Sequence, residues 1–294
     1  MKFTKMHGIG NDYIYFDCTG KNGENMIKNP EKLSVAMSKY HFAVGADGIV
    51  LIMKSDIADF RMRMFNADGS EGKMCGNATR CIGKYVYERG LTDKTEITLE
   101  TLSGIKYIKL TAENGKVSQV SVDMGEASFK PADVPVVCDY DEFVNKPLTI
   151  NNAVQNATCV SVGNPHCVIF TDTDIDTIEL EKIGPMYENA EIFPERINTE
   201  FVNIINKNTL KMRVWERGSG ETFACGTGAC AVASSAVKCG ICKKNTDITV
   251  MLKGGNLKIC IQNDGHIIMT GPASFVYDGE LCNEFIEKEN LQDA

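Results

Sequence analysis

Short segments in which apolar and polar residues alternate dominate the chain and predict β-strands. In Phe60–Met64 and Leu210–Val214 apolar residues alternate with Arg or Lys, which is the period of a half-buried strand. Comparable strand-like runs, separated by Gly, Asn and Asp, cover residues 95–110, 117–124, 248–261 and 266–270. We therefore expect a fold built mainly from short strands.

Two helices are predicted, each after one of these strands and a connection rich in Gly, Ser and Asp. The helices should begin directly after Cys75 and Cys225 and end near Gly90 and Gly240, because glycine is common just past a helix end. The second helix contains Gly228–Val237, which is almost entirely small and apolar. A helix that is apolar on every side is buried, so we expect a sheet to wrap closely around it.

Long-range self-similarity indicates a duplicated domain. Phe60–Asn77 aligns with Leu210–Thr227 without a gap at an offset of 150, which places Cys225 against Cys75. Two segments upstream match at offsets of 153 and 152, namely Gly10-Asn11 with Gly163-Asn164 and Ala46–Val50 with Asn198–Val202. We expect an α/β (α+β) fold of two pseudo-symmetric domains. Each should be a curved, mostly antiparallel sheet or barrel around a central helix, with the active site in the cleft between the domains.

Composition and charge exclude several classes of protein. The 294 residues are 43% hydrophobic and 24% charged, which is ordinary for a globular chain. A net charge of -8 argues against a general nucleic-acid binder. No run of about 18 apolar residues predicts a membrane span. The N-terminal residues lack the apolar core of a secretory signal, so we expect a cytoplasmic protein.

Twelve cysteines are many for such a chain. In a reducing compartment most of them should be free thiols that pack as small hydrophobes. Cys239 and Cys242 form one CxxC pair, which without a second pair is weak support for a zinc or redox site. The four histidines show no metal-ligand spacing, and no phosphate-binding or dinucleotide-binding glycine motif is present. No cofactor and no metal are therefore predicted.

The paired cysteines Cys75 and Cys225 suggest acid–base chemistry. A thiol just before a helix N-terminus lies where unpaired N–H groups and the helix dipole stabilise a thiolate. The same N–H groups can hold a carboxylate, and Gly76 and Gly226 permit its close approach. Two such groups on opposite faces of one carbon can invert its stereochemistry, since one removes a proton and the other supplies one. Alternatively, both cysteines are buried remnants of the duplication.

Several motifs together resemble the diaminopimelate epimerase family, over residues 3 to about 280. They are His7–Tyr13, Gly45–Gly48, Phe65–Glu71, Met74–Arg80, Gly163–His166, Arg196–Glu200, Trp215–Gly218 and Ala224–Gly228. The resemblance implies a cofactor-independent enzyme that interconverts LL- and meso-diaminopimelate for lysine and peptidoglycan synthesis. It also implies a homodimer and two barrel-like halves, residues 1–122 with about 275–294, and residues 123–274.

The resemblance also implies roles for individual residues. Cys75 and Cys225 would be the acid/base thiols. N–H groups at Gly76-Asn77 and Gly226-Thr227 would hold the reacting carboxylate. The groups that would recognise the substrate are Asn11, Asn66, Asn164, Asn198, Glu216 and Arg217. Of these, Glu216 would meet the ammonium, Arg217 the distal carboxylate, and His166 with Glu216 would tune the thiol pKa values. Many relatives carry Gln where this chain has Gly48, so a contact from that side chain is missing.

Three other functions remain open at this stage. A proline or hydroxyproline racemase-like enzyme would use the same paired thiols but would enclose its substrate mainly with apolar groups. A thiol-redox or metal-binding protein would use the thiols together with Cys239 and Cys242. A small-amino-acid binding protein would bind its ligand without exchanging the α-proton.

Overall fold

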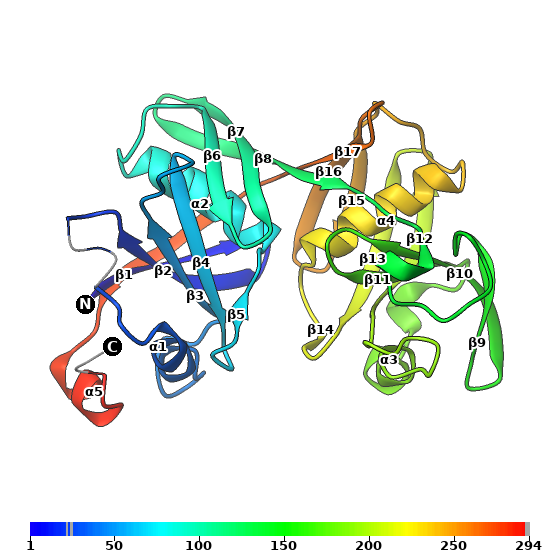
Figure 1. Ribbon diagram of the computed structural model, residues 1–294, viewed down its shortest axis with the longest axis horizontal. Helices are drawn as coiled ribbons and strands as arrows, with labels where there is room; N and C mark the ends of the chain where they lie inside the picture. Colours follow the sequence, from blue (N-terminus) through cyan, green and yellow to red (C-terminus); the bar gives the residue numbers. More distant parts are fainter. Residues whose placement is uncertain (22, 24–25, 292–294) are drawn as a thin grey trace. The chain divides into compact units, whose positions relative to one another are not determined.

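The protein is described by a computed structural model that covers residues 1–21, 23 and 26–291 (Figure 1). The chain divides into two compact units. Unit 1 comprises Met1–Val122 and Gly271–Ala294, and unit 2 comprises Asp123–Thr270. The chain thus passes between the units twice, once within β8 and once at the end of β17.

Unit 1 is a curved sheet with three helices. Its strands are β1 (Lys2–Gly8), β2 (Asn11–Cys18), β3 (Gly48–Met53), β4 (Phe60–Asn66), β5 (Glu71–Gly72), β6 (Glu96–Thr101), β7 (Gly104–Glu113), β8 (Lys116–Glu126) and β18 (Ser274–Glu280). Its helices are α1 (Pro30–Met37), α2 (Gly76–Glu88) and α5 (Asn283–Lys288). The main strands pair in the order β18-β1-β2-β3-β4-β6-β7-β8, with β2–β3 and β4–β6 parallel and the other pairs antiparallel.

Unit 2 repeats this plan. Its strands are β9 (Lys146–Ile150), β10 (Ala153–Ser161), β11 (Pro165–Phe170), β12 (Asn198–Asn206), β13 (Thr209–Glu216), β14 (Gly220–Glu221), β15 (Ile248–Leu252), β16 (Gly255–Ile261) and β17 (His266–Gly271). Its helices are α3 (Leu180–Glu188) and α4 (Gly226–Lys238), with short 3-10 turns η2 (Pro131–Asp133) and η3 (Ile175–Thr177). The order is β9-β10-β11-β12-β13-β15-β16-β17, with β11–β12 and β13–β15 parallel.

The two parallel pairs therefore fall at the same places in both units, which confirms the predicted duplication. β18 stands beside β1 in unit 1 as β9 stands beside β10 in unit 2. The strand register corrects one detail of the sequence alignment. Ile49 pairs with Phe65, and Thr199 pairs with Trp215, so this segment matches at an offset of 150. The offset of 152 expected for it was wrong, because small and apolar residues on both strands fit either register.

Each sheet curves around its central helix. Helix α2 contacts β1, β2 and β7, and α4 contacts six strands of unit 2. A Cβ on Gly83 would lie 3.0 Å from the Ile108 and Leu110 side chains, so α2 can approach the sheet this closely only with glycine there. Among the described residues no ladder joins β18 to β8, so the sheet of unit 1 is open and does not close into a barrel. The mixed α+β fold class is confirmed.

Apolar side chains of each unit form its core. Phe16, Ile49 and Phe65 are fully buried in unit 1, and Cys159 and Cys167 are buried with Ile169 and Phe201 in unit 2. The twelve cysteines are free thiols, and most are buried, as predicted for small hydrophobic residues. No helix of the described part of the chain is long and apolar enough to cross a membrane.

Candidate active site

The two central helices begin in the same way, each with a cysteine as the N-cap residue. Cys75 is extended (φ -133°, ψ 120°), and its Sγ accepts a hydrogen bond from the Ala78 N–H at 3.5 Å. Cys225 is also extended (φ -113°, ψ 109°), and its Sγ accepts from the Gly228 N–H at 3.3 Å. Both sulfur atoms therefore lie among the N–H groups of a helix terminus, where negative charge is stabilised.

In unit 1, Asn11 holds the Cys75 thiol. The thiol donates to Asn11 Oδ1 at 3.5 Å, and the Asn77 amide donates to the same oxygen at 3.1 Å. The Asn11 amide in turn donates to Asp47 Oδ2 at 2.7 Å. Burial and the nearby charge of Asp12 raise the pKa of Asp47, although its hydrogen bonds act against this. The side chain of Asn11 is thus part of a network that ends at the thiol.

Two other residues of unit 1 lie beside this network, because Gly48 follows Asp47 in the chain and Asn66 pairs with Gly48 between β4 and β3. Asn66 ends β4 and donates to Ser70 Oγ at 3.0 Å, which orders the turn before β5. Gly48 begins β3, where a Cβ would lie only 2.0 Å from the Phe65 carbonyl oxygen. A side chain at this position therefore does not fit on this backbone without a shift of β3 against β4.

In unit 2, carboxylates surround the Cys225 thiol. Cys225 is 4% exposed, and the Thr227 hydroxyl lies 3.5 Å from its Sγ. Glu216 forms a hydrogen bond with Cys225 and accepts another from the Thr222 hydroxyl. Burial, followed by the charges of Glu216 and Glu200, raises the pKa of Cys225 well above its usual range. The lowering expected at a helix N-terminus is therefore outweighed in the unliganded protein, and the neutral thiol is favoured.

His166 connects two further side chains of this unit. Its Nδ1 lies 2.6 Å from Glu200 Oε1, and its Nε2 lies 3.0 Å from Asn164 Oδ1. His166 and Glu200 have no exposed surface. Burial raises the pKa of Glu216, and the nearby His166 acts to lower it. These contacts join Asn164, His166, Glu200, Glu216 and the Cys225 thiol into one cluster.

Asn198 fixes the backbone that carries Arg217. The Asn198 amide donates to the Pro165 carbonyl at 2.7 Å, and its oxygen accepts from the Arg217 N–H at 2.9 Å. Asn198 is 4% exposed. The Arg217 guanidinium donates to the Glu195 carbonyl at 2.8 Å and is only partly buried. Asn198 therefore positions the loop, whereas Arg217 retains a partly exposed cationic group.

Two members of these networks, Glu200 and Asp47, were absent from the predicted site. Each lies within a motif quoted for the family, but neither was assigned a role. The signal that could have revealed Glu200 is a single acidic residue inside the otherwise uncharged segment 197–206. An isolated charge in a buried strand normally has a partner, and here that partner is His166.

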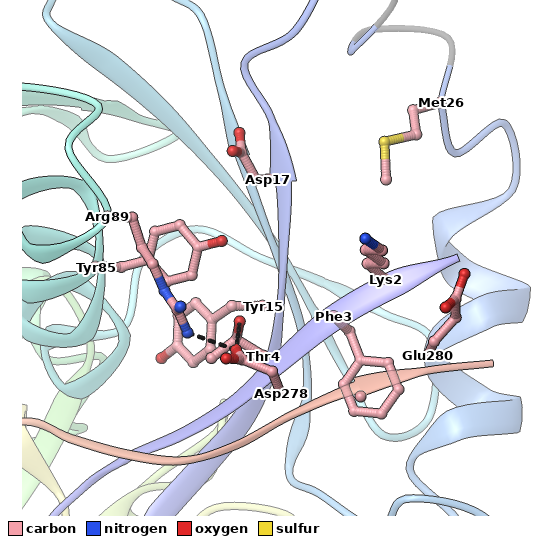
Figure 2. Close-up of a pocket in the computed structure, with 11 residues that line it drawn as sticks. Lys2, Phe3, Thr4, Tyr15, Asp17, Met26, Tyr85, Arg89, Asp278 and Glu280 are labelled. Carbon is pink, nitrogen blue, oxygen red and sulfur yellow. Dashed lines mark hydrogen bonds and ion pairs between the residues drawn. The ribbon is translucent and has the colours of Figure 1, made fainter.

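A cavity of about 650 Å³ in unit 1 is separate from these networks. Its lining includes Thr4, Tyr15, Tyr85, Arg89 and Asp278, and none of the predicted site residues (Figure 2). Figure 2 shows the Arg89 guanidinium directed toward Asp278, with which it forms an ion pair at 2.5 Å. Thr4 donates to the same carboxylate at 2.7 Å. These polar groups satisfy one another at the junction of β1, α2 and β18.

Among the described residues, no further metal-ligating side chains are grouped with Cys239 and Cys242 of the CxxC pair. Cys239 lies 3.7 Å from the Thr158 hydroxyl, and Cys242 is buried, which raises its pKa. Within the described residues no group of three or more His, Cys, Asp or Glu side chains is arranged to hold a metal ion. The redox and metal-site hypotheses therefore gain no support from the surroundings of this pair.

Comparisons with known proteins agree on one family. The diaminopimelate epimerase family profile matches residues 3–130 and 158–276. A diaminopimelate epimerase of Methanococcus maripaludis is 52% identical over 96% of this chain and 99% of the relative. A diaminopimelate epimerase of Acetivibrio thermocellus is 52% identical over 96% of this chain and 98% of the relative.

Solved structures of lower identity share the fold. A phenazine biosynthesis protein of the PhzF family from Bacillus anthracis has a TM-score of 0.67 at 18% identity, over 96% of this chain and 99% of that chain. A probable proline racemase from Agrobacterium radiobacter has a TM-score of 0.69 at 12% identity, over 96% of this chain and 93% of that chain. The fold is thus common to several enzymes, whereas the sequence matches are specific. The chain belongs to the diaminopimelate epimerase family.

Proposed function

We propose that this protein is a cofactor-independent amino-acid epimerase that interconverts LL-2,6-diaminopimelate and meso-diaminopimelate by two-base transfer of the α-proton. The observation that carries the proposal is the repeated N-cap cysteine. Cys75 and Cys225 begin equivalent helices, and each has its own set of polar neighbours. Family membership over most of the chain supports diaminopimelate as the substrate.

In the proposed reaction, both thiols act on the same α-carbon. A thiolate at one cysteine removes the proton, the pair of electrons remains as a carbanion-like centre, and the other thiol supplies a proton to the opposite face. Each acid or base contributes on the order of 10²–10⁴-fold to such a step. The helix N–H groups at Gly76-Asn77 and Gly226-Thr227 would stabilise the extra charge on the reacting carboxylate.

The surroundings of Cys225 suggest which group accepts the proton of its thiol. The pKa of the thiol is raised by burial and by Glu216 and Glu200, so Cys225 rests as the proton donor. For the reverse direction the thiol must lose its proton before it can act as a base. Glu216 is hydrogen-bonded to Cys225, and burial raises the pKa of Glu216 as well. The hydrogen bond with Cys225 acts against that rise, and its contact with the thiol makes Glu216 the proposed acceptor of the proton.

The remaining predicted residues divide into two roles. Arg217 is proposed to bind the distal carboxylate, Asn164 and Asn66 to meet polar substrate groups, and Glu216 to lie near the reacting ammonium. Asn11 and Asn198 each form hydrogen bonds with protein groups through both the nitrogen and the oxygen of the side-chain amide. We therefore propose that these two position the Cys75 thiol and the Arg217 loop.

The proposed biological setting follows from the substrate. Interconversion of the two isomers serves lysine and peptidoglycan precursor synthesis, in the cytoplasm. A homodimer is the proposed assembly. The negative net charge fits a small-molecule enzyme with no nucleic-acid partner.

The test is proton NMR in heavy water of reduced, metal-chelated protein with LL-diaminopimelate. Loss of the α-proton signal together with appearance of the meso isomer would establish inversion without a cofactor. L-Proline and trans-4-hydroxy-L-proline are the comparison substrates, because a proline racemase shares the fold. Exchange with proline alone would assign the racemase function instead. Binding without exchange of any α-proton would assign a binding protein.

A further inference from the structure

Glu200 is a buried carboxylate that touches the candidate site through two neighbours. Its Oε1 lies 2.6 Å from Nδ1 of His166, and both side chains have no exposed surface. A Cβ on Gly228 would lie 2.8 Å from the same oxygen, so Glu200 abuts the first turn of α4. The Gly228 N–H is the group that donates to the Cys225 thiol at 3.3 Å. Glu200 is thus packed against both the histidine and the turn that holds the thiol.

The fold itself does not require a glutamate at this position. Glu200 pairs with Val214 on β13, and Val50 pairs with Met64 on β4, both at the offset of 150. The counterpart of Glu200 in unit 1 is therefore Val50, which is fully buried. Since the same strand can be built with valine, the glutamate adds a cost of burying charge that the architecture alone does not need.

Only part of that cost is recovered by hydrogen bonds. Oε1 meets His166, whereas Oε2 is buried and has no hydrogen-bond partner among the described residues. Leaving a buried acceptor unsatisfied costs about 1–3 kcal/mol. Incompletely satisfied buried carboxylates occur mainly where a function retains them. The position of Glu200 behind the histidine of the candidate site indicates which function that is.

We propose that Glu200 is a positioning residue that fixes hydrogen on Nδ1 of His166 and thereby orients the ring toward Asn164. A carboxylate can only accept hydrogen bonds, so the nitrogen that faces it must donate. The other nitrogen, Nε2, is then the one that meets the Asn164 side chain at 3.0 Å. Asn164 Oδ1 is itself an acceptor, so Glu200 fixes the hydrogen on Nδ1 and the orientation of the ring, whereas the role of Nε2 is set by Asn164. This inference rests on the proposed function, in which Asn164 binds substrate.

A second effect of Glu200 acts on the thiol. The groups that face Cys225 are Glu216, Glu200, the Thr227 hydroxyl and the Gly228 N–H. After burial, the nearby carboxyl groups of Glu216 and Glu200 are the main causes that disfavour the thiolate. Removing the charge of Glu200 should therefore lower the pKa of Cys225 and make its thiol react faster with an alkylating reagent.

The experiment compares the full-length wild type with Glu200→Gln, Glu200→Val and the control Glu88→Gln. Glutamine keeps the shape of Glu200 without its charge, and valine copies Val50 of unit 1. Glu88 is another buried carboxylate, at the C-terminal end of α2. Three quantities are measured: the nitrogen-15 NMR signals of the His166 ring, the alkylation rate of Cys225 at pH 8, and kcat with KM for diaminopimelate.

The expected results are specific to the charge of Glu200. Wild-type His166 should carry hydrogen on Nδ1, and Glu200→Gln and Glu200→Val should alter that signal. Cys225 alkylation should accelerate several-fold in both variants. The value of kcat should fall by about 10–100-fold, the usual effect of removing a group that orients a histidine ligand, with a smaller change in KM. Glu88→Gln should lose stability but retain the wild-type kcat, His166 signal and alkylation rate.

The other possible outcomes also decide whether Glu200 is a positioning residue. A folded Glu200→Gln protein with wild-type kcat and an unchanged His166 signal would overturn the proposal. If that variant does not fold, Glu200→Val is judged by the same criteria. If neither folds, Glu200 is structural and the proposal is wrong. If the wild type does not epimerise diaminopimelate, the proposed function fails, while the nitrogen and alkylation measurements, which need no substrate, still decide the role of Glu200.

Discussion

Cys75 and Cys225, 150 positions apart, cap two 13-residue helices, and each sulfur accepts the N–H of the residue three positions further on. Their surroundings nevertheless differ. Cys75 donates to the neutral Asn11 amide, whereas Cys225 lies beside the carboxylates of Glu216 and Glu200. The duplication has therefore preserved the position of the thiol, while its electrostatic environment has diverged.

Replacing either cysteine with serine should abolish epimerisation. A hydroxyl is far less acidic than a thiol, so Cys75→Ser and Cys225→Ser should each lower kcat by at least about 10³-fold. Epimerisation is measured by NMR or by chiral chromatography of the product. Circular dichroism should show that both variants remain folded. Wild-type activity in either variant would exclude the two-thiol mechanism.

Cys225 should be slow to react in the unliganded protein. Its raised pKa favours the neutral thiol, and only the thiolate attacks iodoacetamide. At pH 8 its alkylation, followed by mass spectrometry, should be at least about tenfold slower than that of the exposed Cys282, the internal reference. Equal rates at the two positions would show that burial and the neighbouring carboxylates do not control the thiol.

Two equivalent arginine–glutamate pairs should differ in their contribution to stability. Arg213 binds Glu221 through two nitrogens and also donates to the Ile175 and Ile178 carbonyls. Arg213→Met should lower the free energy of unfolding by about 3 kcal/mol, because it leaves a buried carboxylate less well paired.

The matched variant is Arg63→Met in unit 1. Arg63 binds Glu71 with similar geometry, but both side chains are more exposed, at 29% and 28%. Its loss should cost no more than about 1 kcal/mol. Urea denaturation measures both values, and a larger loss for Arg63 would contradict the ranking by burial.

A side chain at position 48 should destabilise unit 1. A Cβ there would lie 2.0 Å from the Phe65 carbonyl, so β3 and β4 would have to separate. Gly48→Ala should reduce the free energy of unfolding by about 3 kcal/mol. The control is Gly90→Ala, where φ is +72° and no atom lies within 4 Å of the added carbon. That change should cost only about 1–2 kcal/mol from backbone strain. Similar losses at both positions would show that β3 accommodates the side chain.

Glu88 should make stability depend on acid pH. Burial alone would raise its pKa, but hydrogen bonds from Lys84, the Val117 N–H and Lys116 outweigh burial and lower it. A lowered pKa means that Glu88 stabilises the folded state above the unfolded pKa of about 4.3. This contribution is lost as pH falls through the still lower folded pKa. The difference in urea midpoint between wild type and Glu88→Gln should therefore be largest near pH 7 and shrink below about pH 4. A difference that is constant with pH would exclude this linkage.

The parts of the structure that depend on local pattern could be predicted from the sequence. Alternation in Phe60–Met64 and Leu210–Val214 identified β4 and β13, and both helices begin directly after their cysteines. Gly90, expected just past a helix end, has the positive φ that this role requires. Each of these features is determined by residues close together in the chain. Helices α1, α3 and α5 were not anticipated, since their patterns are short and weakly periodic.

Features that depend on contacts between distant residues escaped prediction. The role of Glu200 becomes visible only when β12 pairs with β11 and brings it to His166. The raised pKa of Cys225 reflects burial and then carboxylates from two strands, β13 and β12, against the local effect of the helix terminus. The obstacle to a side chain at Gly48 comes from the neighbouring strand. In each case the deciding neighbour lies far away in sequence.

The position of β18 has a consequence for how the chain folds. Thr4 on β1 meets Asp278 on β18, 274 positions later. The strand beside β1 is therefore synthesised after the whole of unit 2, whereas β9 and β10 of unit 2 emerge together. Pairings between such distant segments form slowly, because a long loop must close first. During synthesis this edge of β1 stays uncovered until unit 2 has been made, so unit 1, which contains the earlier strands, is the second of the two units to be completed.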